Sequence, residues 1–218
     1  MAYNRLFAFI ALPFGVLFAG CGMFGKAQRQ VLPVPPYSPM PGALSDSYLH
    51  SPSGDIVAHY PKGWLHVDIH TIPLDNVEEV YTNHARSVAL VLSEIPSTAE
   101  FRRNVERDGM VALADQSFAS KSATAPGKLA ITRPTDLYTE NGKVLASYEY
   151  AELGPDSTQL VHNRVILFTT GAKFYELNMV ELASPKRPSE TIQNFRLLES
   201  VSASLEGVAE IRPDTTGL

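Results

Sequence analysis

The strongest constraint on the fold is a series of strand-like segments joined by tight turns in the second half of the chain. Asn141-Gly142 is typical of a two-residue hairpin turn, and it separates residues 136–139 from residues 144–153. Strands that follow one another this closely pair in an antiparallel manner. The sequence therefore predicts a meander whose strands cover residues 128–132, 136–139, 144–153, 160–169 and 174–182.

Three earlier segments complete the predicted sheet. Residues 55–60 and 65–71 flank the turn Pro61-Lys62-Gly63, and apolar residues alternate with polar ones along the second segment. Residues 88–95 are almost continuously apolar. That pattern indicates a strand covered on both faces.

Two helices are predicted, one after these early strands and one after the meander. Ser97 and Glu100 have the spacing of a capping box, so a helix should begin there and run to about Ser120. Gly109 in its middle is a weak point, because glycine lowers helix propensity. Ser189 can cap a second helix that runs to about 205. The residues expected to face the core are Phe101, Val105, Leu113 and Phe118 in the first helix and Ile192, Phe195, Leu198 and Leu205 in the second.

The expected fold class is α+β, with a mostly antiparallel β-sheet and helices on both faces. Helices are expected on both faces because the central strands lack a wholly polar side. Apolar residues make up 44% of the 218-residue chain, so a sizeable core can form. The single cysteine permits no internal disulfide. The core must therefore form without a disulfide.

The N-terminus has the features of an export signal in their usual order. Arg5 precedes apolar residues 6–18, a run shorter than the ~20 residues of a membrane-spanning helix. The run ends in Leu17-Phe18-Ala19-Gly20-Cys21, which resembles the bacterial lipobox except that Phe18 stands where leucine is usual. By this resemblance, residues 1–20 are a signal peptide and Cys21 is acylated, with palmitate among the acyl chains. An uncleaved anchor or an ordinary secreted protein is the alternative.

The lipidated cysteine also predicts an address. Aspartate after the cysteine favours retention in the inner membrane, and Gly22 stands there instead. We therefore expect the periplasmic side of a membrane, and the outer membrane rather than the inner one. Each acyl CH₂ that is buried contributes ~0.8 kcal/mol, so several chains anchor a protein without a spanning helix. The net charge of −5 argues against nucleic acid as a partner.

Three regions are expected to follow the signal peptide. Residues 21–47 should form the lipid anchor and a proline-rich tether, because five prolines fall between positions 33 and 41 and favour extended geometry. The alternative is an N-terminal arm that packs along the domain. Residues 48–206 should form the folded domain, and residues 207–218 a flexible tail.

The order of these segments resembles that of the PsbP-like family, which is named after an accessory protein of photosystem II. Tyr60-Pro61-Lys62-Gly63-Trp64 is similar to the aromatic-Pro-x-Gly-Trp turn after that family's first domain strand. The apolar strand at 88–95 before a capped helix, the hairpins and the closing helix with Phe195 support the likeness over roughly residues 56–205. The resemblance implies an α/β/α sandwich. It also implies a domain that binds proteins or assists assembly of membrane complexes, in some members as a bacterial lipoprotein.

The most suggestive side chains for chemistry lie on one predicted strand. His66, Asp68 and His70 alternate with apolar residues, so they share a strand face, and two imidazoles with a carboxylate suit zinc. On a flat strand, however, such neighbours are ~7 Å apart. One ion would therefore need further ligands from elsewhere, and the alternative is a solvated strand face. The metal ligands of photosynthetic PsbP-like proteins have no match here, so no metal or other cofactor is assigned.

The catalytic patterns that we sought are missing. There is no Gly-x-Ser-x-Gly elbow, no phosphate-binding glycine loop and no dinucleotide fingerprint. Acylation of Cys21 would leave no thiol for catalysis. Glu149 and Glu152 are more typical of an exposed strand than of an acid–base pair. Trp64 either pins the Gly63 turn into the core or stands exposed as a binding anchor. We therefore expect no enzyme.

Two functional hypotheses remain. The first is a non-catalytic, membrane-anchored lipoprotein that acts as an interaction or assembly module of a membrane or envelope complex, with Trp64, His66 and His70 as possible interaction residues. The alternative is a periplasmic lipoprotein that binds a small molecule or a metal, in a pocket between sheet and helix or on the His66–His70 strand.

Overall fold

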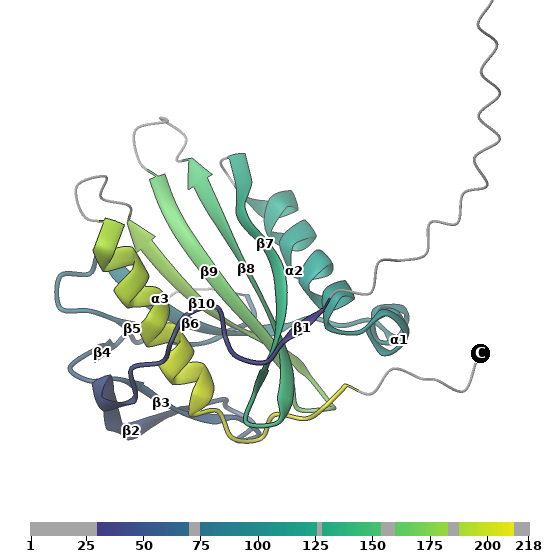
Figure 1. The fold of residues 1–218 in the computed structure, drawn as a ribbon, viewed down its shortest axis with the longest axis horizontal. Helices are drawn as coiled ribbons and strands as arrows, with labels where there is room; N and C mark the ends of the chain where they lie inside the picture. The colour runs from purple at the N-terminus through teal and green to yellow at the C-terminus, as the bar shows by residue number, and fades with distance from the viewer. Residues whose placement is uncertain (1–29, 70–74, 126–127, 154–159, 183–187, 212–218) are drawn as a thin grey trace, which may run out of the picture.

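The computed structural model describes residues 30–69, 75–125, 128–153, 160–182 and 188–211 (Figure 1). The predicted signal peptide, Cys21 and His70 lie outside these residues. The strands are β1 (Val31–Leu32), β2 (Leu44–His50), β3 (Val57–Pro61), β4 (Leu65–His66), β5 (Val77–Thr82), β6 (Val88–Ile95), β7 (Lys128–Glu140), β8 (Lys143–Leu153), β9 (Leu160–Thr169) and β10 (Phe174–Leu182). The helices are the 3-10 helix η1 (Pro41–Ala43), α1 (Ala99–Asp108), α2 (Met110–Thr124) and α3 (Pro188–Ala203).

An eight-stranded sheet in the order β1-β7-β8-β9-β10-β6-β5-β4 forms the middle of the molecule. Its neighbours pair antiparallel, apart from the parallel pair β1 and β7. Helix α3 and the hairpin β2–β3 lie over one face, and α1 and α2 lie over the other (Figure 1). The α+β class with helices on both faces, an α/β/α sandwich, is confirmed.

The two faces of the sheet bury separate cores because strand side chains alternate. On β9, Ile166 and Phe168 belong to the core under α3, whereas Val165 and Leu167 belong to the core under α1 and α2. Such a strand is apolar on both sides. This explains why the meander strands are so continuously hydrophobic in sequence.

The first predicted helix is two helices. Thr98, not Ser97, is the N-cap of α1, and its side chain accepts a hydrogen bond from the backbone N–H of Phe101. Gly109 has φ 73° and ψ −160°, a conformation that is open essentially to glycine alone, and it ends α1 and begins α2. The weak point predicted at Gly109 is therefore a complete break. The break lets both helices bury their apolar sides against the sheet.

Residues 30–47 differ from the tether that the sequence suggested. Val31 and Leu32 pair in parallel with β7, and Leu32, Tyr37 and Leu44 pack against the core under α3. The described part of the proline-rich segment is therefore an arm packed along the domain, which is the alternative considered above. The predicted domain start at Tyr48 is too late, because these apolar side chains bury surface that a free tether would expose to water.

The C-terminal boundary also shifts. Residues 207–211 were predicted as the start of a flexible tail, yet Ala209 donates its backbone N–H to the Thr169 carbonyl at 2.7 Å. Val208 and Ile211 each pack against one of the two cores. Gly207 has φ 88°, and a Cβ there would lie 2.0 Å from the carbonyl oxygen of Asp55. The folded domain therefore reaches at least residue 211.

Most predicted strands are confirmed, with two differences. The segments 128–132 and 136–139 form one strand, β7, with register irregularities around Pro134. The segment 65–71 is a strand only over β4, and its last two residues lie outside the described ones.

Within α3, Ile192 is 51% exposed, so its predicted inward orientation is wrong, whereas Phe195 and Leu198 are buried.

Candidate functional site

An open cavity lies at the β4 edge of the sheet. Its volume is about 500 Å³, and it is lined by Leu65, His66, Val67, Asp68, Val80, Thr82, Arg86 and Ala89. These residues come from β4 and the segment after it, from β5, from β6 and from the β5–β6 turn. The cavity therefore includes part of the strand that the sequence analysis singled out.

Strand register accounts for the apolar floor of this cavity. Leu65 lies opposite Thr82, and Thr82 lies opposite Ala89, so these three side chains form one row across the strands. Val67 donates its backbone N–H to the carbonyl of Val80 at 2.9 Å, which extends the pairing beyond β4. Residues 88, 90 and 92 on the opposite face are buried in the core under α3. The cavity therefore lies on the face of the sheet that α1 and α2 cover further along.

The β5–β6 turn carries Arg86 to the cavity. The Asn83 carbonyl accepts from the Arg86 N–H at 2.9 Å, and the Asn83 side chain accepts from the Ser87 N–H at 3.0 Å. Arg86 has φ 53°, a left-handed conformation that costs a side-chain-bearing residue free energy. The Asn83 hydrogen bonds offset this cost and hold the backbone of Arg86 in the turn, so that its exposed side chain lines the cavity.

The structure describes two of the three predicted interaction residues. Trp64 is half-buried and packs against the core under α3, which fits a pin for the Gly63 turn. His66 is exposed, lies 5.2 Å from the ring of Tyr81 between centroids, and places Nε2 2.7 Å from a carboxylate oxygen of Glu79. His70 lies outside the described residues.

The described residues do not form a metal centre. Among the described residues, no group of three or more His, Cys, Asp or Glu side chains converges as metal ligands. The imidazole of His66 is engaged with Glu79, which comes from β5 rather than from the predicted ligand strand. The ligand set His66, Asp68 and His70 stays a prediction, because His70 is outside these residues.

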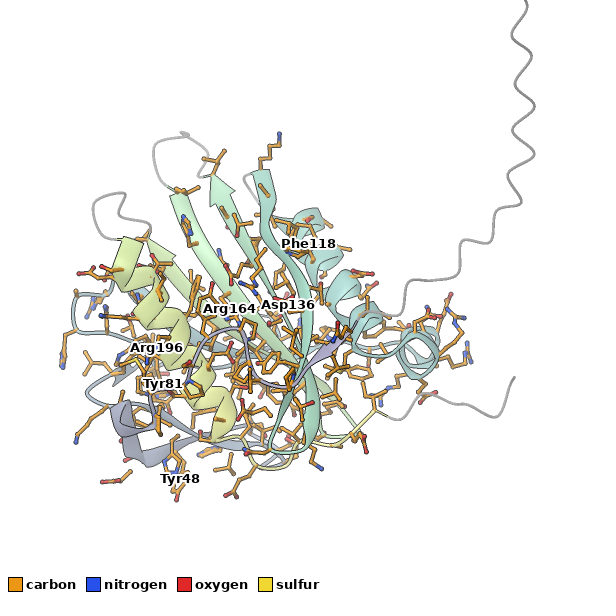
Figure 2. All side chains as sticks on the ribbon, in the orientation of Figure 1. Tyr48, Tyr81, Phe118, Asp136, Arg164 and Arg196 are labelled. Atoms are coloured by element: carbon orange, nitrogen blue, oxygen red, sulfur yellow. The ribbon has the colours of Figure 1, made fainter. Side chains whose placement is uncertain are left out.

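A second group of polar residues lies inside the sandwich, under α3. Arg164, which is labelled in Figure 2, is fully buried. Its guanidinium donates to Glu149 at 2.8 Å, to Glu199 and to Ser147. Tyr138 donates its hydroxyl to Glu199 at 3.0 Å. Burial raises the pKa of the Glu199 carboxyl, although the charge of Arg164 opposes that shift.

The arm covers this buried cluster. The ring of Tyr37 lies 4.6 Å from the guanidinium carbon of Arg164, and its hydroxyl donates to Glu149 at 2.9 Å. The Tyr37 ring also meets Phe195 edge-on, with centroids 5.6 Å apart. Burial and the neighbouring Glu149 raise the pKa of the Tyr37 hydroxyl, so it remains a hydrogen-bond donor at neutral pH. Tyr37 therefore seals Arg164 from water by a cation–π contact and a hydrogen bond.

The opposite face holds its own polar group between α2 and the sheet. Ser117 donates to Glu176 at 2.8 Å and lies 2.8 Å from the Tyr148 hydroxyl, while Lys121 forms an ion pair with Glu176. Burial raises the pKa of Tyr148 far above its ordinary value. These side chains meet within the packed layer, so this group joins α2 to β8 and β10.

Sequence reasoning missed two arginines that the structure makes prominent. Arg164 stands in an apolar strand, and its acidic partners Glu149 and Glu199 come from distant positions in the sequence. Arg86 lies in a turn with no glycine at the left-handed position. Its one sequence signal is Asn83, a residue typical of turns.

Comparisons with known proteins identify the fold. The Ran-binding protein Mog1p from Saccharomyces cerevisiae aligns over 75% of this chain and 95% of its own, with a TM-score of 0.51 and 14% identity. A second Mog1 structure, that of a point mutant, aligns over 76% and 97%, with a TM-score of 0.52 and 13% identity. A cyanobacterial PsbP from Synechocystis aligns over 73% and 91%, with a TM-score of 0.46 and 18% identity.

These comparisons extend to structure and not to sequence. No family model matches the chain, and no curated protein matches it at a significant level. Within the described residues, no helix is both long and apolar enough to span a bilayer. The sheet with helices on both faces and the likeness to the Mog1 structures together establish an α/β/α sandwich. This is the fold that the PsbP-like resemblance predicted.

Proposed function

We propose that this protein is a non-catalytic lipoprotein, anchored through a lipid on Cys21, that serves as an interaction or assembly module of a membrane or envelope complex. The proposal combines an address with a binding role. The address rests on the N-terminal sequence, in which the chain's one cysteine follows an apolar run and two small residues. The binding role rests on the folded domain.

The observation that carries the binding role is the incomplete cover of the sheet. Strand β6 has the continuous apolar sequence of a strand covered twice, yet its residues alternate between buried and half-buried. Val88, Leu90 and Leu92 are in the core under α3, whereas Ala89 and Val91 on the other face are only half-buried. Apolar surface that the described chain leaves partly open is typical of a contact surface.

The buried charges support a binding role rather than catalysis. Arg164 and Glu176 are committed to ion pairs inside the packed layers, and the exposed lining of the open cavity is mostly apolar in area. Catalytic sites instead gather perturbed titratable groups in an accessible cleft. Mog1, which shares the fold, is described as a Ran-binding protein, so this kind of sandwich can serve as a protein-binding domain.

The docked arm limits how far the domain can stand from a membrane. From Cys21 to Gln30, where the described arm begins, a fully extended chain spans at most about 30 Å. In this proposal the domain therefore stays close to the lipid surface, rather than at the end of the longer tether that the sequence suggested.

Affinity purification after mild detergent extraction tests this function. Full-length protein is expected to bring down a defined set of membrane or envelope proteins, in amounts comparable to its own. A Cys21→Ser variant, expressed at the same level, should leave the membrane fraction and lose those proteins. Recovery of the chain alone under every extraction condition would contradict the proposal.

A small-molecule role is the second candidate, and the cavity of about 500 Å³ favours it, since ligand pockets have similar volumes. Native mass spectrometry of the purified protein, with metal analysis of wild type and of His66→Ala and His70→Ala, examines this role. A bound molecule or ion in wild type that either substitution removes would favour it. A ligand-free mass and no metal would remove it.

A further inference from the structure

Basic residues gather at the end of the sheet where the cavity opens. Lys62 lies in the turn before β4, and His84 and Arg86 lie in the turn between β5 and β6. Because β4 runs antiparallel to β5, with Leu65 opposite Thr82, these two turns are at the same end of the sheet. Lys62 and Arg86 thus place two cations at the end of the sheet beside the cavity, although the whole chain has a net charge of −5.

Lys62 and Arg86 form no ion pair within the part of the chain that the structure describes. Lys62, His84 and Arg86 are exposed. Arg86 is moreover fixed in its left-handed conformation by Asn83, which reduces the entropy that binding would otherwise cost. The cavity therefore has a cationic side chain at one end, on a backbone whose conformation is fixed.

Arg86 gives the cavity one cationic end. Asp68 lines the cavity three residues beyond Leu65 along the chain, further from the β5–β6 turn that carries Arg86. A carboxylate in the cavity would be attracted to Arg86. A ligand with an apolar body and one negative charge can therefore lie in one orientation, with its charge towards the turn.

The neighbouring sheet edge indicates what kind of ligand this is. Among the described strands, β4 is the last in the sheet order and pairs on one side only, with β5. An extended peptide can add to such an edge through backbone hydrogen bonds while alternate side chains enter a pocket on one face. Leu65 is 43% exposed at this edge, so its side chain is available to contact an incoming strand.

We propose that the β4 cavity is the docking site for an extended segment of a protein partner. The segment places an apolar side chain over Leu65, Val80 and Ala89, and it places an aspartate or glutamate against Arg86. This inference rests on the proposed function and specifies the chemistry of the partner. Arg86 is a specificity-determining residue, because the apolar floor alone would accept segments of any charge.

Photo-crosslinking in full-length, membrane-anchored protein tests the site. In the test protein a benzophenone amino acid replaces Leu65. In the control protein it replaces Ile192, a residue of α3 that is 51% exposed. The Leu65 probe should crosslink to a protein partner and the Ile192 probe should not. Mass spectrometry of the adduct should find an aspartate or glutamate within two residues of the crosslinked position.

Charge variants supply the specificity arm of the experiment. Arg86→Glu should lower the crosslink yield at the Leu65 probe by about tenfold or more, and Arg86→Lys should retain most of it. Arg103→Glu, the same charge reversal at an exposed position of α1, should leave the yield unchanged. Thermal unfolding of each variant shows whether folding is intact, and the Arg86→Lys protein keeps the test decisive if Arg86→Glu folds poorly.

Each other outcome has a distinct meaning. A partner that co-purifies with wild type but never crosslinks at Leu65, or crosslinks equally after Arg86→Glu, overturns the docking site and leaves the proposed function standing. Adducts only to lipid, to a small molecule or to residues 70–74 of the same chain overturn it as well. If no partner is recovered by purification or by either probe, the proposed function and the docking site both fail.

Discussion

The two halves of the sheet are built differently. Strands β7 to β9 lie between α3 and the arm on one face and α2 on the other, and they contain the fully buried Arg164. Strands β4 to β6 are covered by the core under α3, but their other face carries the open cavity beside the exposed Arg86. The half formed by β7 to β9 buries its arginine, whereas the half formed by β4 to β6 exposes its arginine to solvent.

This difference teaches which arginine stabilises the fold and which is available for recognition. A buried cation is tolerated only where carboxylates and hydrogen bonds surround it, and their loss is costly. An exposed arginine contributes little to stability, so its position in a constrained turn needs another explanation. The same residue type thus predicts opposite results when it is replaced in the two halves.

The largest effect is expected from Arg164→Met. The substitution leaves Glu149 and Glu199 buried without their cation, which should lower the free energy of unfolding by about 3–5 kcal/mol. Urea unfolding followed by circular dichroism measures the change. Adding Glu149→Gln and Glu199→Gln to the same chain should recover part of the loss. A single variant within about 1 kcal/mol of wild type would show that the ion pairs do not stabilise the doubly covered half.

A smaller loss is expected when the arm is released. Tyr37→Ala removes the ring over Arg164 and should cost about 2–3 kcal/mol, whereas Tyr37→Phe keeps the ring and should cost about 1 kcal/mol. Limited proteolysis should cut between residues 30 and 40 faster in the alanine variant than in the phenylalanine variant. Equal cleavage in wild type and both variants would mean that the arm is not held by this contact.

The arm also shows where sequence reasoning reached its limit. The local hairpin signal was reliable: Asn141 and Gly142 have φ 49° and 75°, as a two-residue hairpin requires. Docking of Tyr37 instead depends on Glu149, 112 positions away, and the proline pattern is equally consistent with a free tether. The pairing of Arg164 with Glu199 likewise cannot be inferred from the sequence, because it requires α3 to pack over β9. Contacts of this length cannot be inferred from one sequence without the fold.

Asp55 offers a pH-dependent test of how the layer over the sheet is held in place, since it joins the β2–β3 hairpin to β10. Burial raises the pKa of its carboxyl, but hydrogen bonds from Ser51, Ser53, Tyr175 and Thr170 outweigh that effect and lower the pKa to about 2, from an ordinary 3.8. A carboxyl whose pKa is lower in the folded state stabilises the fold above the unfolded value. That contribution is lost as pH falls from 3.8 towards 2.

Wild type should therefore become steadily less stable through this acidic range, and Asp55→Asn should show a smaller slope there because the titrating group is gone. Urea midpoints measured at half-unit steps between neutral pH and pH 2 compare the two proteins. Asp46→Asn, at an exposed position of β2, is the matched control and should keep the wild-type slope. Identical slopes for wild type and Asp55→Asn would contradict the role of these hydrogen bonds.

The smallest effect on stability is expected in the open half. Arg86→Ala should change the free energy of unfolding by no more than about 0.5 kcal/mol. Arg86→Gly should be at least as stable as Arg86→Ala, because glycine adopts a positive φ without strain. Thermal unfolding of the three proteins measures this order. A loss from Arg86→Ala as large as that from Arg164→Met would remove the contrast between the halves.

The proposed action at a membrane depends on the lipid anchor on Cys21. Intact-mass and N-terminal peptide mass spectrometry of protein extracted from its native membranes tests this anchor most directly. We predict a mature chain that begins at Cys21 and carries acyl chains on that residue, with residues 1–20 removed. An N-terminal peptide that retains residues 1–20, with an unmodified thiol at Cys21, would contradict the lipoprotein assignment and with it the proposed place of action.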